Sequence, residues 1–145
     1  MRLASFNVRG LPKTRKSLAL RPDIVDVLEC ADIVCVQETW YSKQELGHLN
    51  SLHEEFYGFG CATVDFRDGV CTGHPSGGVT ILFRKSMATF AKPIDLELDW
   101  CCALEISLPS KRLIVFNVYM PFQCRENTEK YAEQLGVLES IIGDL

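Results

Sequence analysis

Apolar and polar positions alternate along the chain in a pattern that predicts strands separated by helices. Residues 2–8 alternate with a period of two, which is typical of a strand with one buried face. Residues 33–38 begin instead with the continuous apolar run IVCV, which is typical of a strand buried on both faces. The same signals predict further strands over residues 57–64, 78–84, 87–93, 101–108 and 112–119. The last two are close enough in the sequence to form a hairpin.

Helical periodicity appears in three other segments. Residues 17–30 carry an apolar stripe, and Pro22 suits the first turn of a helix. Residues 42–55 predict a weaker helix with Ser42 as its N-cap. The third helix follows a cap at Asn127 or Thr128, and its apolar stripe consists of Tyr131, Leu135, Leu138, Ile142 and Leu145. This order of elements predicts an α/β protein with a mixed, largely antiparallel sheet and helices on its outer side.

Composition narrows the class of protein. A chain of 145 residues suits a single domain, and 47% hydrophobic with 23% charged residues excludes a disordered or fibrous protein. No apolar run approaches the ~18 residues that span a bilayer, and no signal peptide is evident. The seven cysteines are odd in number and form no CxxC pair, so neither disulfides nor a zinc site is predicted. We therefore expect a soluble, intracellular protein of the nucleus or cytoplasm, in a reducing compartment and without membrane contact.

Charge is unevenly distributed. The net charge of -4 does not indicate a nucleic-acid-binding protein. Five basic residues nevertheless fall close together, namely Arg9, Lys13, Arg15, Lys16 and Arg21. Such a cluster is either a solvated loop or a local patch that contacts phosphate groups, and both interpretations stay open.

Polar side chains stand at or near the ends of three predicted strands. These are Asn7, Glu38, Asn117 and Tyr119. In layered α/β folds, ligand-binding residues gather where strands meet their loops. If these strand ends lie side by side, they form an oxygen-rich cluster that suits Mg²⁺ or Mn²⁺. Each residue also has a structural interpretation, as a cap, a surface residue, a packed aromatic ring or a partner of backbone groups.

Four segments in this order resemble the successive motifs of a known superfamily. They are SFNVRGL at 5–11, DIVCVQETW at 32–40, SGGVTILFRK at 76–85 and LIVFNVYMPF at 113–122. Together they resemble the endonuclease/exonuclease/phosphatase superfamily, in particular the endonuclease domain of non-LTR (LINE-type) retrotransposons. The resemblance implies a DNase I-like fold, a four-layer α/β/β/α sandwich, of which residues 1–145 would form the N-terminal half.

The resemblance also implies roles for individual residues. Glu38 matches the metal-binding glutamate, which would hold Mg²⁺ or Mn²⁺. Asn7 matches an asparagine that orients the phosphate, and Tyr119 matches a tyrosine that donates a hydrogen bond to it. The reaction would be hydrolysis of a DNA phosphodiester by an activated water, leaving a 3'-hydroxyl. The expected substrate-binding residues are Arg9, Lys13, Arg15, Trp40 and Asn117.

Several family features are absent from the sequence. Arg9 stands where many relatives carry an acidic residue, and Phe122 stands where many carry an asparagine. The family's second half contains a GDxN strand end and an Asp–His pair that supplies the general base. The GDL at 143–145 continues a helical pattern, and none of the three histidines follows an aspartate at a strand end.

We therefore expect a single incomplete domain over residues 1–145, poorly active and marginally stable, whose partner is the missing C-terminal half. Two alternatives stay open. One is another phosphoesterase of the superfamily, acting on inositol phosphates, lipids or RNA. The other is a non-catalytic remnant.

Overall fold

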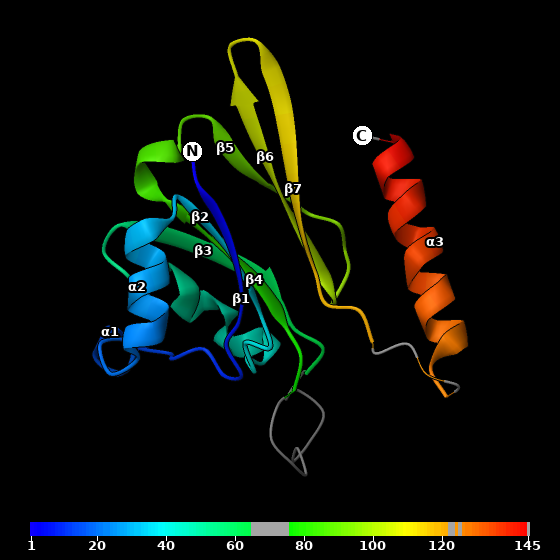
Figure 1. Cartoon of the computed structure of the whole chain (residues 1–145), viewed down its shortest axis with the longest axis horizontal. Helices are drawn as coiled ribbons and strands as arrows, with labels where there is room; N and C mark the ends of the chain where they lie inside the picture. Colours follow the sequence, from blue (N-terminus) through cyan, green and yellow to red (C-terminus); the bar gives the residue numbers. More distant parts are fainter. Residues whose placement is uncertain (65–75, 122–123, 125, 145) are drawn as a thin grey trace.

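The structure, a computed structural model, describes residues 1–64, 76–121, 124 and 126–144. Its centre consists of two β-sheets that pack face to face (Figure 1). The first sheet has the strand order β1-β2-β4-β3, formed by β1 (Leu3–Asn7), β2 (Ile33–Gln37), β3 (Phe56–Cys61) and β4 (Val79–Arg84). The second has the order β5-β6-β7, formed by β5 (Ala91–Ile94), β6 (Cys101–Leu108) and β7 (Lys111–Val118). Only β1 and β2 pair in parallel among these strands, which confirms the mixed, largely antiparallel arrangement.

Helices cover the outer face of the first sheet, and a further helix follows the second sheet along the chain. The first sheet is covered by the helices α1 (Arg15–Leu18) and α2 (Pro22–Cys30) and by the 3₁₀ helix η1 (Lys43–Ser51). A short 3₁₀ turn, η2 (Lys85–Met87), connects β4 to β5, and α3 (Thr128–Asp144) follows β7. Figure 1 shows α1 and α2, the first sheet, the second sheet and α3 in succession across the molecule. The predicted α/β/β/α order of layers is therefore present.

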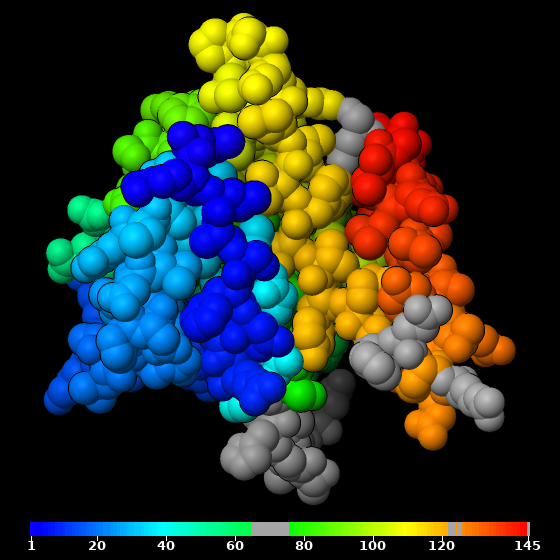
Figure 2. Space-filling model, in the orientation of Figure 1, coloured from blue at the N-terminus to red at the C-terminus, as the bar shows by residue number. Residues whose placement is uncertain are grey.

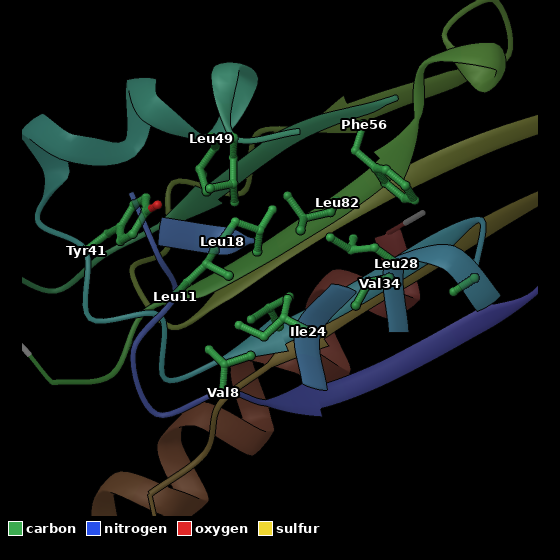
Figure 3. Close-up of a cluster of buried hydrophobic side chains, with 13 residues drawn as sticks. Val8, Leu11, Leu18, Ile24, Leu28, Val34, Tyr41, Leu49, Phe56 and Leu82 are labelled. Atoms are coloured by element: carbon green, nitrogen blue, oxygen red, sulfur yellow. The ribbon is translucent and has the colours of Figure 1, made fainter. Parts of the chain in front are cut away.

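Strand β2 lies at the centre of the first sheet and is buried on both faces. Val34 and Val36 point toward α2 and η1, in a cluster with Leu28 and Leu49 (Figure 3). The alternate residues Ile33 and Cys35 face the second sheet, in a separate cluster that includes Leu104 and Ile106 of β6. This double burial explains the continuous apolar run in the sequence.

Several predicted elements differ from the observed ones. The single helix expected over 17–30 is two helices, because Pro22 begins α2 and cannot continue α1. The helix expected over 42–55 is the 3₁₀ helix η1, whose start is fixed by a capping box between Ser42 and Glu45. The strand expected over 87–93 begins only at Ala91, after η2.

The last helix turns a different face to the protein from the one predicted. Leu135 is 42% exposed and Ile142 is 60% exposed, whereas Gln134 is buried. The apolar stripe of α3 therefore lies partly in solvent, and Leu145 falls outside the described residues. Within the described part of the chain, none of the helices is both long and apolar enough to cross a membrane.

The edges of both sheets meet on one face of the molecule. Among the strands that the structure describes, β1 pairs only with β2 and β7 pairs only with β6, so each has one edge without a described partner. Figure 2 shows β1 in blue and β7 in gold on the same face. A hollow of about 300 Å³ between them is lined by Leu3, Cys35, Gln37 and Val115, among others.

A buried amide joins the two sheets beneath their rim. Asn117 of β7 is 1% exposed, and its Nδ2 donates to the carbonyl oxygens of Val36 (2.9 Å) and Thr80 (2.8 Å). Its Oδ1 accepts a hydrogen bond from Gln37 Nε2 at 2.6 Å. Both ends of the Asn117 amide are therefore bonded inside the protein, and contact of this residue with substrate stays a prediction.

We expect Asn117→Leu to lower the free energy of unfolding by about 2–3 kcal/mol, because it leaves buried polar groups without their partner. Lys111→Ala, at an exposed position of the same strand, is the matched control and should change it by less than about 0.5 kcal/mol. Urea unfolding followed by circular dichroism measures both. Equal effects of the two substitutions would contradict the inter-sheet role of Asn117.

Candidate active site

The ends of β1 and β2 run on into two loops that are clamped together by backbone hydrogen bonds. Three amides of the segment 8–11 donate to three carbonyls of the segment 37–39: Val8 to Gln37 (3.1 Å), Gly10 to Glu38 (2.8 Å) and Leu11 to Thr39 (3.0 Å). On the other side, the amides of residues 39 and 40 donate to the carbonyls of Gly78 and Gly77 at 3.3 and 3.1 Å. The segment that follows β2 is therefore held from both sides.

This clamp presents the carboxylate of Glu38 to two side chains from different parts of the chain. Asn7 Nδ2 donates to Glu38 Oε1 at 2.7 Å, and the Tyr119 hydroxyl donates to the same oxygen at 3.1 Å. Asn7 ends β1, and Tyr119 follows β7 directly. Side chains at strand ends of both sheets thus meet at one oxygen atom.

The hydrogen bonds to Glu38 favour its ionised form. The bond from Asn7 lowers the pKa of Glu38 most; burial opposes it, and Tyr119, Arg9 and Trp40 add to the lowering. The pKa of Tyr119 is raised, by burial and by the adjacent carboxylate. At neutral pH the cluster therefore contains a carboxylate and a protonated phenol.

Backbone strain is concentrated around this carboxylate. Arg9, Glu38 and Trp40 adopt φ values of 47°, 54° and 58°, in the left-handed region that L-residues rarely occupy. Gly10, at φ 102°, adjoins them. Such conformations persist only where the surrounding bonds impose them, and they cluster at functional sites.

Gly10 has no room for a side chain. A Cβ atom at this position would lie 2.8 Å from Cε3 of Trp40, so the indole ring packs directly on the glycine backbone. Beside the ring is a hollow of about 530 Å³, whose lining includes Arg9, Lys13, Leu20 and Arg21. A second hollow, of about 710 Å³, adjoins Tyr119 and is lined on its far side by α3.

Two of the basic residues form ion pairs that the sequence did not suggest. Lys13 forms an ion pair with Glu45. Arg15 pairs with Glu54 at 2.7 Å. Their acidic partners lie over thirty positions away along the chain, so the sequence did not reveal these pairs. Both cations lie outside the Glu38 cluster, and their contact with substrate stays a prediction.

The adjacent aromatic residues Trp40 and Tyr41 lie in different environments. Trp40 remains 36% exposed at the rim. Tyr41 is 1% exposed and donates its hydroxyl to the carbonyl of Pro12 at 2.6 Å, so it fixes the loop after β1 and does not face substrate (Figure 3).

Glu38 is the residue of this cluster that could hold a metal ion. No group of three or more His, Cys, Asp or Glu side chains suited to a metal occurs among the described residues. Mg²⁺ does not require one, because it commonly binds one or two carboxylates together with water and substrate phosphate. The ionised Glu38 beside the amide of Asn7 therefore fits a Mg²⁺ site that substrate completes.

Sequence reasoning missed three residues of the site. Gln37 supports the cluster through Asn117 and also donates to Ser5 Oγ at 3.1 Å. Thr39 is buried at the clamp, and Gly10 lies under Trp40. Gln37 and Thr39 flank Glu38 in the sequence, so their position could have identified them as site residues. The contact between Gly10 and Trp40 joins distant segments, so the sequence could not have revealed it.

We expect Asn7→Ala to raise the pKa of Glu38, since Asn7 donates the hydrogen bond that lowers it most. The folded-state pKa of Glu38 is depressed, so its stabilising contribution is present at neutral pH and is lost as the pH falls through that value. Carboxyl-carbon NMR titration of Glu38 measures the change, with Asn127→Ala, in the turn before α3, as the control. An unchanged titration of Glu38 in Asn7→Ala would contradict the assignment.

Gly10→Ala should destabilise the fold by at least about 1 kcal/mol, because it combines a positive φ with a clash against Trp40. Gly47→Ala is the matched control, since a Cβ at Gly47 meets nothing within 4 Å. Thermal unfolding of the two variants tests this, and the Trp40 fluorescence should shift only in Gly10→Ala. A Gly10→Ala protein as stable as Gly47→Ala would show that the contact is unimportant.

Comparisons with known proteins show which fold and which family the chain has. A search of curated proteins found no match. The solved structures that share the fold include the APE2 catalytic domain from Xenopus laevis, with a TM-score of 0.59 and 19% identity over 100% of this chain and 55% of that chain. They also include D. rerio TDP2 complexed with single strand DNA product, with a TM-score of 0.54 and 16% identity over 97% of this chain and 54% of that chain. The 3' phosphatase NExo (D146N) from Neisseria bound to product DNA hairpin has a TM-score of 0.53 and 18% identity over 99% of this chain and 52% of that chain. The chain thus spans about half the length of these structures. Residues 4–141 match the Endonuclease/Exonuclease/phosphatase family, and because this match covers nearly all of the sequence, the chain belongs to that family.

Proposed function

We propose that this chain carries part of the active site of a metal-dependent phosphodiester hydrolase that acts on DNA. The observation that supports it most is the ionised Glu38, which Asn7 and Tyr119 hold by one oxygen at the rim of the two sheets. A carboxylate fixed beside an amide and a phenol is suited to a hard divalent ion and a phosphate group.

Each residue of the cluster has a role in this proposal. Glu38 would hold Mg²⁺ or Mn²⁺, which neutralises phosphate charge and stabilises the leaving oxygen when bound. Asn7 keeps the carboxylate ionised and in place. Tyr119 has a protonated hydroxyl at neutral pH, so it can turn from Glu38 to donate a hydrogen bond to a phosphate oxygen. Arg9 adds a positive charge that attracts the phosphate.

Two features favour DNA as the substrate. The TDP2 and NExo structures hold DNA products, and their fold is shared by this chain. The exposed Trp40 and the adjacent Arg9 suit a polynucleotide, which offers both bases and phosphates. The finer resemblance, to the endonuclease domain of non-LTR retrotransposons, stays a prediction that rests on the sequence motifs.

The cluster lacks a general base among the described residues. Neither His48 nor His53 hydrogen-bonds to Glu38, Asn7 or Tyr119; His53 instead accepts from the amide of Glu55 and packs on Phe56. We propose that a base from outside the described residues completes the site. The edges of β1 and β7 beside it, which pair with no further strand of the described part of the chain, support this. A non-catalytic role is favoured if no base can be supplied.

Supercoiled plasmid with Mg²⁺, assayed with and without added imidazole as an external base, tests this proposal. We expect slow nicking that imidazole accelerates, and a loss of at least about 100-fold in Glu38→Gln, since the metal carboxylate is removed. Glu29→Gln, at an exposed position of α2, is the control and should nick normally.

Other outcomes would contradict the proposal. Phosphate release from small phosphomonoesters without nicking would indicate another phosphoesterase of the superfamily. No activity under any of these conditions would favour the non-catalytic remnant.

A further inference from the structure

We propose that Trp40, together with the hollow between the loop at 9–13 and residues 17–21, forms a subsite that stacks one unpaired nucleobase beside the scissile phosphate. This inference rests on the proposed function, because it places the base next to the Glu38 cluster. It goes further by specifying which form of nucleic acid the site accepts.

The first support is the way in which Trp40 is kept at the surface. Its φ of 58° is unfavourable for a large side chain. A hydrogen bond from its backbone amide to the carbonyl oxygen of Gly77, at 3.1 Å, holds this conformation. One part of the ring lies on Gly10, where even a Cβ atom would collide with it. The neighbouring Tyr41, by contrast, is fully buried. The loop thus exposes one aromatic ring in a fixed position while the next enters the core.

The second support is the chemistry of the hollow beside the ring. Leu20 is 78% exposed there, next to Pro12, and both offer apolar contact. Arg9 contributes positive charge, whereas Lys13 and Arg21 are ion-paired with Glu45 and Asp23, and no carboxylate is among the residues that line the hollow. An aromatic ring, aliphatic neighbours and the guanidinium of Arg9 match a base and its phosphate better than they match a protein segment.

The third support is that Trp40 lies two residues after Glu38 in the loop that follows β2. Backbone hydrogen bonds hold this loop from both sides. A base on Trp40 therefore belongs to a nucleotide at or next to the phosphate that the cluster holds. Bases within a duplex already stack on both faces and cannot offer one to the indole ring. The subsite thus selects a nucleotide that is single-stranded or has left the stack.

Trp40 fluorescence tests this proposal directly. The chain has two tryptophans, so Trp100→Phe leaves Trp40 as the single reporter. In this background, with Ca²⁺ in place of Mg²⁺, we titrate a short single-stranded oligonucleotide, the same sequence as a duplex, and a backbone of abasic sugar phosphates of equal length. We expect saturable quenching by the single strand, and binding at least tenfold weaker for the abasic backbone and the duplex.

Matched substitutions, made without the Trp100→Phe change and measured by anisotropy of a labelled strand, separate stacking from simple burial. Trp40→Phe should retain most of the affinity, whereas Trp40→Leu should lose about tenfold, because leucine has no ring to stack. Circular dichroism establishes that both variants fold. Equal binding by the Phe and Leu variants, or equal binding of the abasic backbone and the single strand, would overturn the subsite.

Failure of the proposed function can be distinguished from failure of the subsite. Hydrolysis of bis(4-nitrophenyl) phosphate with Mg²⁺ and imidazole reports on Glu38 and does not require a nucleobase. Base-dependent quenching without this hydrolysis upholds the subsite and refutes the hydrolase, whereas hydrolysis without base-dependent quenching refutes the subsite alone.

Discussion

The site depends on one oxygen atom, Oε1 of Glu38, which receives hydrogen bonds from the end of the first strand and from the end of the last. Asn7 and Tyr119 are 112 positions apart in the sequence; Asn7 ends a strand of the first sheet, and Tyr119 directly follows a strand of the second. Their convergence therefore requires both sheets to hold a fixed relative position. The buried amide of Asn117 and the half-buried amide of Gln37 supply that constraint directly beneath the rim, since they bond one sheet to the other.

The same constraint explains where the backbone is strained. The loop after β2 must leave a buried strand, present a carboxylate and expose an indole ring within four residues. It does so through positive φ values at Glu38 and Trp40, stabilised by backbone hydrogen bonds to the loop after β1 and to the glycines before β4. The strain is thus carried by a rigid frame, which keeps Glu38 preorganised.

Much of the fold and the centre of the site could be predicted from the sequence, for physical reasons. Strand patterns and turn residues are local, so β6 and the start of α2 at Pro22 followed from them. The cluster of Asn7, Glu38 and Tyr119 followed from motif order and resemblance. Long-range pairing could not be predicted: the ion pairs of Lys13 and Arg15 and the burial of Asn117 depend on segments far apart in the sequence. The outward turn of Leu135 is likewise a tertiary effect, because periodicity defines a stripe without saying what it faces.

We propose that Glu38 holds a divalent metal ion and that Asn7 and Tyr119 position its carboxylate. Paramagnetic broadening by Mn²⁺, followed by NMR of side-chain amides and tyrosine rings, tests this most directly. We expect the Asn7 amide and the Tyr119 ring to broaden at the lowest Mn²⁺ concentrations, and Glu38→Gln to abolish this effect while Glu29→Gln does not. Broadening centred elsewhere, or unchanged in Glu38→Gln, would contradict it.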